Sequence, residues 1–540
     1  MSMSNLKNFI KTNLAYFILL FFLVLIVYAN SLNNGFVSDD ILAIPKNPVI
    51  GSVTSFLSQP YAFVQPLLYS FAYKVGALNP AIYRLINIVF HLGTVWTIYL
   101  LFSALGKKSD GFYPAAIFAV HPILIESVGW ISGGPYVRYS FFLLAALLTY
   151  IMSKKNKQFY FISLTFTALG LFASEKAIVF PLILFLYEVT FSDIRRNWKR
   201  LIPFFLLSCI WISLYVLKIG MRYSNLQNEF YQKPVIYNPL IQLPIALTSY
   251  LSLIFWPDKL TLYHSEMSFS QVEYGIRFLI TLGLLGGLGI FWKKNRLIFF
   301  WLSFFIVSLL PTLLPFGWSW IVAERYVYLG TIGVLSVVGY VLGAIIKNKK
   351  TEAIGYLIFI LIILGLMTRT IVRNIDWKNE DNLWIATGRT SSSDPKTHNN
   401  LGDVYGRQGD LARSAEEFKT AIKLNPYYAD AYHNLGNTYQ QLGKTDLALK
   451  NYQQAIKYNP SLWQSYQNMA AIYFYQGAIA SAEAYLNQAI KVNPTNALLY
   501  ANLAVVYLKD NDKITAKKLL EKALEINPKD EQIKKIYISL

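Results

Sequence analysis

Two adjacent carboxylates, Asp39 and Asp40, follow directly on an apolar run in the stretch NNGFVSDDILAIPKNPVI, residues 33–50. One of them could act as a general base that takes a proton from an incoming hydroxyl, while its neighbour orients it. Two acids this close also raise the pKa of one of the pair. Adjacent aspartates are equally common in solvated loops, so the pair alone admits a catalytic and a purely structural interpretation.

Three further stretches place ionisable side chains at the ends of apolar runs. They are AVHPILIESVGWISG (119–133) with His121 and Glu126, FASEKAIVFP (172–181) with Glu175 and Lys176, and VAERYVYLG (322–330) with Glu324 and Arg325. Ionisable groups at a membrane edge indicate function, and Arg325 could hold a lipid phosphate through paired, charge-assisted contacts. The alternatives are structural: a His–Glu contact, a Glu–Lys ion pair and a Glu–Arg anchor.

The elements that would position these residues are membrane helices. The 540-residue chain is 54% apolar and only 15% charged, whereas soluble chains average about 25% charged residues. Apolar runs of roughly 17–22 residues recur up to Arg373, each long enough to cross ~30 Å of hydrocarbon. We therefore expect an all-α chain, with a polytopic membrane domain of about eleven full spans at 1–375 and a linker at 376–396. The first run, Leu14 to Ala29, is interpreted as a retained span rather than a cleaved signal peptide.

Basic joints between spans face the cytoplasm. They are Lys7 with Lys11, and the joints at 106–110, 153–157, 195–200, 293–296 and 347–350. Alternation of the spans then places the loop 31–79, which carries the aspartate pair, and the C-terminal domain outside. The apolar segment 239–257 breaks this alternation if it crosses, so we favour a re-entrant or paired segment there.

The net charge of +19 is concentrated in the membrane part, since 30 of the 49 basic residues but only 13 of the 30 acidic residues precede residue 376. This excess indicates topology and not a nucleic-acid surface, and we expect no nucleic-acid partner. The single cysteine, Cys209, excludes a disulfide framework. The five histidines show no metal-ligand spacing, so no metal site is expected from them.

The C-terminal part repeats with a period of 34 residues. NLGDVY, NLGNTY, NMAAIY and NLAVVY begin at 400, 434, 468 and 502, and Asn-Pro recurs at 425, 459, 493 and 527. This spacing is typical of tetratricopeptide repeats, in which small residues let paired helices approach and stacking buries what one pair cannot. We expect four repeats and a capping helix at 397–540. Such arrays usually bind peptides or proteins, and a structural or self-associating array is the alternative.

Together and in this order, the motifs resemble the transmembrane and tetratricopeptide-repeat family of protein O-mannosyltransferases and its bacterial relatives of the GT-C glycosyltransferase fold. The similarity rests on FVSDD, on HPILIESV, on the charged pair Glu175 and Lys176 before an apolar run that contains proline, and on AERYVYL. It also rests on DWKNEDNLW at 376–384 before the repeats, and on the spaced set Asn79, Pro80, Tyr83, Asn87 and His91. It covers nearly the whole chain.

Three positions depart from the family pattern. Ser174 stands where the family has a basic residue, although Lys176 is close by, and Gln65 replaces an arginine. The charged segment after the His-Pro motif is GGPY at 133–136, with Arg138 as a possible substitute. These departures bear mainly on the identity of the donor.

The resemblance implies an integral-membrane enzyme that transfers a sugar from a polyprenyl-phosphate donor to an acceptor hydroxyl on a protein at the extracytoplasmic face of a bacterial plasma membrane. The catalytic base would be Asp39 with Asp40 in support. The phosphate-binding cations would be Arg325, Arg138, Lys176 and Arg84, supported by His91, His121, Glu126, Glu175 and Glu324. A divalent cation on the aspartate pair is conceivable but is not required by such donors, and the repeats would recruit the acceptor protein.

Two other functions remain open. An O-antigen ligase or polymerase would place its key Arg and His in a large late outer loop, whereas the large outer loops expected here are 31–79 and 220–274. A non-enzymatic membrane scaffold would use only the repeats and would not need the aspartate pair.

Overall fold

The computed structural model describes residues 11–52, 61–105, 111–228, 238–313 and 321–540. Within these ranges the chain is helical and contains no strand, which confirms the all-α prediction. Two compact units are present. The first runs up to Tyr223 and resumes after the gap at 229–237 to reach Thr390, and the second comprises Ser391–Leu540 with a short stretch that begins at Ser224.

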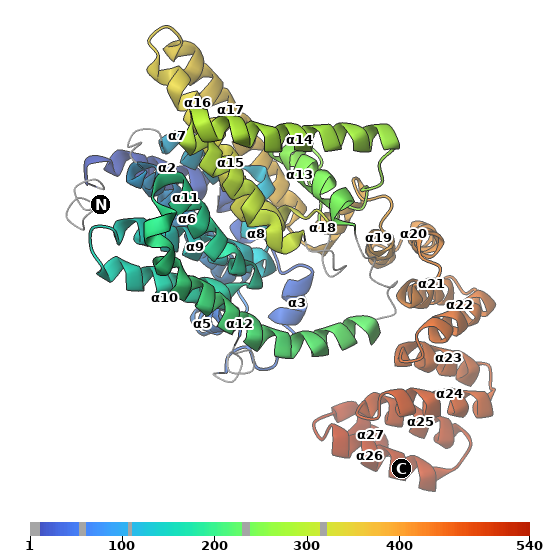
Figure 1. The fold of residues 1–540 in the computed structure, drawn as a ribbon. Coiled ribbons are helices and arrows are strands. Elements are labelled where there is room, and N and C mark those ends of the chain that lie inside the picture. The colour runs from blue at the N-terminus through green and yellow to red at the C-terminus, as the bar shows by residue number, and fades with distance from the viewer. Residues whose placement is uncertain (1–10, 53–60, 106–110, 229–237, 314–320) are drawn as a thin grey trace. The chain divides into compact units, whose positions relative to one another are not determined.

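The first unit is a bundle of apolar helices (Figure 1). Its helices are α2 (Leu14–Tyr28), α3 (Asp39–Ala43), α5 (Val64–Gly76), α6 (Pro80–Ala104), α7 (Phe112–Ala119), α8 (Ile125–Val128), α9 (Gly134–Met152), α10 (Gln158–Ala173), α11 (Phe180–Phe191), α12 (Ile194–Asn228), α13 (Pro239–Phe255), α14 (Gln271–Lys294), α15 (Arg296–Leu309), α16 (Tyr328–Lys347), α17 (Glu352–Asp376) and α18 (Glu380–Gly388). Short 3-10 turns join them, among them η3 (Ile131–Gly133), η4 (Glu175–Val179) and η6 (Glu324–Val327).

Seven helices among the described residues are long and apolar enough to cross a membrane. They are Leu14–Asn33, Pro80–Ala104, Ile131–Met152, Ile194–Val216, Gln271–Lys294, Glu324–Lys347 and Glu352–Asp376. Shorter apolar helices in the same unit are Gln158–Ala173, Leu240–Phe255 and Arg296–Thr312. Seven is fewer than the eleven expected crossings; the full number of crossings stays a prediction, because short helices can contribute to a span.

Some joints that are expected on the same side of the membrane contact one another. Arg200 Nη2 donates to Ser153 Oγ at 2.5 Å, which joins two of the basic segments expected on one side. The loop 31–52 contacts the segments around 129–132 and 374–380, all expected on the other side. Lys7 and the joint 106–110 lie outside the described residues. Which side of the membrane these joints face stays a prediction.

Helix α13 occupies the segment whose crossing was uncertain. The Tyr274 hydroxyl, in the first turn of α14, donates to the Leu240 carbonyl at the start of α13 at 2.8 Å. At its other end the Ile254 carbonyl lies 2.8 Å from His121 Nε2. The two ends of α13 thus contact Tyr274 and His121. Whether this segment crosses the membrane, re-enters it or pairs with a neighbour stays a prediction.

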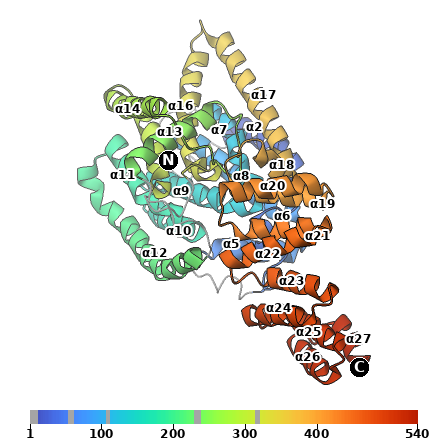
Figure 2. The same ribbon diagram turned by 90° about the vertical axis from the view of Figure 1, so that its right-hand side faces the viewer.

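The second unit is the expected stack of helix pairs (Figures 1 and 2). Its helices are α19 (Pro395–Arg407), α20 (Leu411–Leu424), α21 (Ala429–Gln441), α22 (Thr445–Tyr458), α23 (Trp463–Tyr475), α24 (Ile479–Val492), α25 (Ala497–Lys509), α26 (Lys513–Ile526) and α27 (Glu531–Ile538). Each of the four pairs closes through a residue with positive φ: Gly409, Gly443, Gly477 and, in the fourth, Asn511. Asparagine is among the few residues that tolerate this left-handed conformation.

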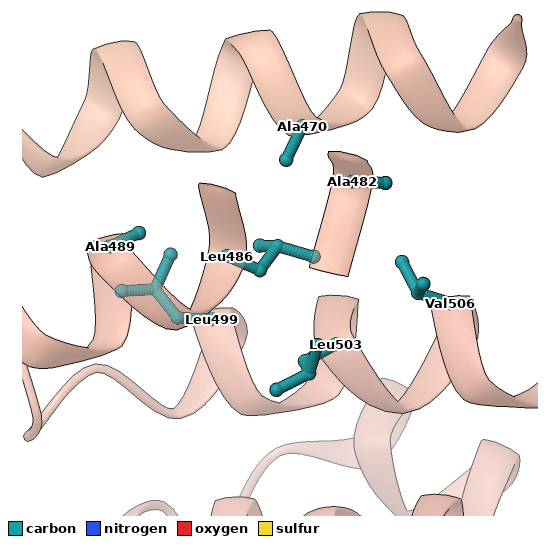
Figure 3. Close-up of a cluster of buried hydrophobic side chains, with 7 residues drawn as sticks. All are labelled: Ala470, Ala482, Leu486, Ala489, Leu499, Leu503 and Val506. Carbon is teal, nitrogen blue, oxygen red and sulfur yellow. The ribbon is translucent and has the colours of Figure 1, made fainter. Parts of the chain in front are cut away.

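Small buried side chains hold neighbouring repeats together. Ala482 of α24 is completely buried in a cluster with Ala470, Leu486 and Leu503, drawn in Figure 3. A larger residue at a packed position forces side chains off their rotamers and costs about 1–3 kcal/mol.

We therefore expect Ala482→Leu to loosen the third repeat. Hydrogen exchange on the full chain should become faster in α23 to α25, whereas Ala480→Leu, at an exposed position of the same helix, should leave exchange unchanged. Equal exchange in the two variants would contradict the packing described for Ala482.

Candidate active site at the rim of the helical unit

Asp40 is a fully buried carboxylate in the first turn of α3. Its Oδ1 accepts from the Ser132 backbone N–H at 2.8 Å and from the Ser132 hydroxyl at 2.5 Å, and its Oδ2 accepts from the Val37 N–H at 3.3 Å. Burial raises the pKa of Asp40 to about 6, and the hydrogen bonds and the nearby Arg84 charge limit that rise. The side chain therefore fastens the loop 31–52, which carries the aspartate pair and is called the aspartate loop below, to η3.

Asp39, the adjacent residue, has a different environment. Its side chain is exposed and makes no hydrogen bond or ion pair within the described residues. Consecutive residues of a helix point in directions about 100° apart, so one acid of the pair is directed inward and the other outward. Asp39 is thus the member of the pair whose carboxylate is accessible from outside.

The residue before the pair is held in a strained conformation. Ser38 has φ 54° and ψ −126°, a region that non-glycine residues rarely occupy and that costs on the order of 1–3 kcal/mol. Its N–H donates to the carboxylate of Glu380 in α18, whose other oxygen accepts from Trp384 Nε1 at 2.7 Å. Such strain tends to persist at functional sites.

Arg84 also supports the loop. It is fully buried, and its Nε, Nη1 and Nη2 donate to the carbonyls of Gly129, Asn34 and Gly35 at 2.6, 2.8 and 3.0 Å. The guanidinium thus replaces missing backbone partners between the 34–35 turn and the end of α8. A phosphate contact by Arg84, as the resemblance suggested, would have to compete with these three bonds.

Trp130 connects the aspartate loop to Arg325. Its indole Nε1 donates to the Val37 carbonyl at 3.3 Å, and its ring lies 5.8 Å from the Arg325 guanidinium carbon. The indole also stacks on Trp377 with 5.6 Å between ring centroids. The aspartate pair and Arg325 therefore share one neighbourhood.

Arg325 is paired with Glu126 and not with its sequence neighbour. The Arg325 backbone N–H donates to Glu126 Oε2 at 2.7 Å, and its Nη1 forms an ion pair with Oε1 of the same carboxylate. Glu126 is completely buried, whereas 13% of the Arg325 side chain is exposed. The guanidinium is thereby oriented and keeps an accessible side.

Lys176 lies near the same tyrosine ring as Arg325, that of Tyr326. Its ammonium is 5.0 Å from the Tyr326 ring centroid, 5.3 Å from that of Tyr136 and 3.1 Å from Glu175 Oε1. The Arg325 guanidinium is also 5.0 Å from the Tyr326 ring. One tyrosine ring thus contacts both cations through cation–π interactions.

Arg138, on α9, is a buried cation with spare donors. Nη1 donates to Asn87 Oδ1 at 3.1 Å, while Nε and Nη2 are buried and have no hydrogen-bond partner in the described structure. The contact requires a glycine at 134, because a Cβ there would lie 2.2 Å from Asn87 Oδ1 and 2.6 Å from Arg138 Nη1. An unsatisfied buried guanidinium is costly unless an anion joins it.

Glu324 belongs to a third charged group. Its Oε1 accepts the Thr261 N–H and lies 3.6 Å from both His264 Nε2 and Arg373 Nη2. The carboxylate is fully buried, and its Oε2 has no hydrogen-bond partner among the described residues. Glu324 therefore joins the loop after α13 to helix α17.

The two predicted histidines have structural contacts. His91 Nδ1 lies 2.7 Å from the Tyr328 hydroxyl and Nε2 lies 3.2 Å from the Ala119 carbonyl. His121 Nδ1 accepts from the Ile123 N–H at 3.3 Å, and its Nε2 contacts α13 as described above. Both rings are buried and contact the Tyr328 hydroxyl or backbone groups of neighbouring segments, so they position helices in this structure.

The residues described so far, from the aspartate loop to the charged groups around Arg325, Lys176, Arg138 and Glu324, are called the rim below. Other rim residues were not assigned from the sequence. Ser132, Trp130, Glu380, Trp377 and Arg373 make the contacts described above. The dense tryptophan and acidic content of DWKNEDNLW was the available signal for two of them, but a sequence pattern does not tell which loop a distant tryptophan or glutamate will contact.

The geometry does not fit a metal site on the aspartate pair. No group of three or more potential ligands lies together in the described part of the chain. Both Asp40 oxygens accept hydrogen bonds from Ser132 and Val37, which leaves Asp39 as a single ligand.

Comparison with known proteins identifies the repeats. Family models described as "Tetratricopeptide repeat" match residues 429–462 and 473–537, and a family model described as "TPR repeat" matches residues 402–443. Among solved structures, the crystal structure of MamA protein is 22% identical, with 28% of this chain and 83% of that chain covered and a TM-score of 0.26. At that score the structural likeness adds nothing to the sequence match.

Curated relatives of the chain are named protein O-mannosyl-transferases, which confirms the predicted resemblance. Protein O-mannosyl-transferase TMTC3 of Mus musculus is 24% identical, covering 74% of this chain and 50% of the relative. Protein O-mannosyl-transferase F38B6.6 of Caenorhabditis elegans is 25% identical, covering 76% and 63%. The match thus spans half to two thirds of the length of these relatives.

The raised pKa of Asp40 predicts a pH-dependent stability. Because its folded-state pKa of about 6 exceeds the ordinary 3.8, the folded chain binds this proton first as pH falls. Raising the pH from about 3 to about 7 should lower the free energy of unfolding by about 3 kcal/mol in total. Asp40→Asn should remove this slope from unfolding midpoints of the detergent-solubilised chain, and Glu352→Gln, at an exposed site on α17, should retain it. A wild-type slope in Asp40→Asn would contradict the buried state of this carboxyl.

The close approach at Gly134 predicts a second effect on stability. Gly134→Ala should displace Asn87 or Arg138 and lower the free energy of unfolding by about 1–3 kcal/mol. Gly283→Ala is the control, because a Cβ at Gly283 meets nothing within 4 Å and alanine favours a helix. Unfolding midpoints measured in the same detergent test both; equal midpoints for the two variants would disprove the contact.

Proposed function

We propose that this chain is an integral-membrane glycosyltransferase that moves a sugar from a polyprenyl-phosphate donor to a hydroxyl group of an acceptor protein. The observation that carries the proposal is the junction at Trp130, whose indole contacts both the loop of the aspartate pair and the guanidinium of Arg325. An exposed carboxylate and phosphate-binding cations in one neighbourhood are what such a transfer requires. The names of the curated relatives support the same chemistry.

Asp39 acts as the general base. Its exposed carboxylate accepts the proton of the acceptor hydroxyl while the hydroxyl oxygen attacks the anomeric carbon of the donor sugar. A new carbon–oxygen bond forms, and the bond from that carbon to the phosphate oxygen breaks. The polyprenyl phosphate leaves with the electron pair. Asp40 does not touch the acceptor; it holds the loop against Ser132 so that Asp39 is presented outward.

The developing charge on the leaving phosphate is stabilised by Lys176, Arg138 and the accessible side of Arg325. Arg138 contributes the two nitrogens that lack a partner. Glu126 and Glu175 orient Arg325 and Lys176 through their ion pairs. We leave Arg84 out of this set because its three nitrogens bind backbone carbonyls, and His91, His121 and Glu324 support the surrounding helices.

The fold we infer is of the GT-C type, with the site on the extracytoplasmic side of a bacterial plasma membrane. The basic joints support this orientation, since such segments are retained in the cytoplasm. A donor anchored in the bilayer must be reached from the membrane surface, where the rim residues would lie. The repeats would bind the acceptor polypeptide, as helical arrays of this kind commonly bind peptides.

The Asp39→Asn variant tests the proposal. We expect the rate of transfer of labelled mannose from polyprenyl-phosphate mannose to protein to fall about 10²- to 10⁴-fold in membranes that contain the full chain. Binding of the donor should be unchanged, whereas Lys176→Gln should raise the KM for the donor.

Glu352→Gln is the matched control, because it removes one exposed carboxylate elsewhere in the unit and should keep full activity. Comparative glycoproteomics of cells carrying each variant identifies the acceptors. Unchanged protein glycosylation in the Asp39→Asn strain would favour the scaffold hypothesis and reject an enzymatic role for this rim.

A further inference from the structure

A polar cavity of ≈ 410 Å³ lies outside the rim already described. Helix α13 and the loop 256–270 form one side of it, α14 forms another, and the last residues of the first unit, Arg389 and Thr390, complete it. Its volume lies within the range of sites for small molecules and headgroups. None of the proposed phosphate-binding residues of the rim lines it.

Three permanent cations line this cavity: Arg277, Lys259 and Arg389. Arg277 is fixed in place, because its Nη1 donates to Thr248 Oγ1 at 2.7 Å and to Ser249 Oγ at 3.2 Å, and its guanidinium lies 3.8 Å from the Phe269 ring centroid. A cation fixed in this way loses little side-chain entropy when it binds an anion.

Two acids also line the cavity, Asp258 and Glu266, so the permanent charges sum to a small positive value. Asp258 Oδ1 accepts from the Lys259 N–H at 2.8 Å. Arg369 Nε and Nη2 donate to the carbonyls of Pro257 and Asp258 at 3.0 and 3.1 Å and thereby fix this turn. The hydroxyls of Ser249 and Ser252 supply further neutral donors.

His264 adds an imidazole whose Nε2 makes no hydrogen bond within the described structure and has Glu324 Oε1 as its charged neighbour at 3.6 Å. Only 8% of its side chain is exposed, and it also lines the cavity. The Nε2 of His264 therefore keeps unused hydrogen-bonding capacity beside the cavity. The cations, the hydroxyls and this imidazole are all suited to bind a phosphate group.

The helix that carries Arg277 indicates which kind of phosphate. Apolar side chains before and after Arg277 in the sequence are exposed, with Val272 74% and Leu279 67% accessible. Only 6% of the most apolar 18-residue segment of this helix is buried. Surfaces of this kind are covered by lipid chains in a membrane protein. A ligand bound at Arg277 therefore has an apolar surface beside it for an acyl or prenyl chain.

We propose that this cavity binds the phosphate headgroup of a membrane lipid, at a site separate from the rim. A headgroup phosphate accepts from Arg277, Lys259 and Arg389, while its chain lies along α14. His264 joins the cavity to the rim, because its Nε2 is also 3.6 Å from Glu324. The inference does not depend on the proposed glycosyl transfer.

Native mass spectrometry of the full chain in detergent, with added phosphatidic acid, measures the binding directly. We expect Lys259→Gln with Arg277→Gln to weaken retention of phosphatidic acid about tenfold, in proportion to the charge-assisted hydrogen bonds that are lost. Lys293→Gln with Lys294→Gln removes the same charge at the other end of α14 and should leave retention unchanged. Inorganic phosphate alone should not displace the lipid.

A second variant guards against a folding defect. Arg389 is exposed, so Arg389→Gln should leave the unfolding midpoint unchanged and still weaken retention about threefold, as expected for one exposed charge contact. The proposal is overturned if wild-type protein retains no phosphatidic acid, or if the cavity variants and the α14 control retain it equally. Displacement of the lipid by inorganic phosphate would assign the cavity to a soluble phosphate instead.

Discussion

A carboxylate that is completely buried must have a partner, and the ion pair of Glu126 with Arg325 is the contact on which the rest of the rim depends. It joins two segments 199 residues apart and fixes the backbone of η6 as well as the guanidinium, since the same carboxylate accepts the Arg325 N–H. Breaking such a pair leaves an uncompensated buried charge and costs about 3–5 kcal/mol. With Arg325 fixed, its guanidinium contacts the rings of Trp130 and Tyr326. Trp130 in turn contacts the aspartate loop, and Tyr326 contacts Lys176.

A second set of contacts fastens the beginning of the chain to its middle. Asn34 Nδ2 donates to the Asn374 carbonyl at 2.8 Å, the Gly35 N–H donates to the Lys378 carbonyl at 2.8 Å, and the Ser38 N–H donates to Glu380. These bonds lie at one end of α17, directly before the repeats in sequence. The aspartate loop is short and polar, so it has no core of its own; the segment 374–380 provides the partners that keep the strained Ser38 in place.

The sequence predicted some of these features and not others, for physical reasons. The repeats were predictable because each helix pair packs mainly on its neighbours, so the pattern has a local period and even the left-handed turn recurs at 34-residue intervals. The charged pairs were not. Glu324 precedes Arg325 in sequence, yet Arg325 pairs with Glu126, because adjacent residues in η6 point to different sides. Arg84 was expected to bind phosphate, but a buried guanidinium also satisfies backbone carbonyls, and only the tertiary structure decides between these roles.

The aspartate pair shows why two identical residues can have different roles. Asp40 lies where water is excluded, and its raised pKa means that keeping it ionised at neutral pH lowers stability. An apolar residue would remove that cost, but it would also remove the acceptor for Ser132 and Val37 that sets the direction of α3. Because the contacts of Asp40 and of the backbone fix the loop, the position of Asp39 is determined without any contact of its own carboxylate among the described residues. The unfavourable charge is therefore carried by the residue that fixes the loop, and the carboxylate of its neighbour stays exposed.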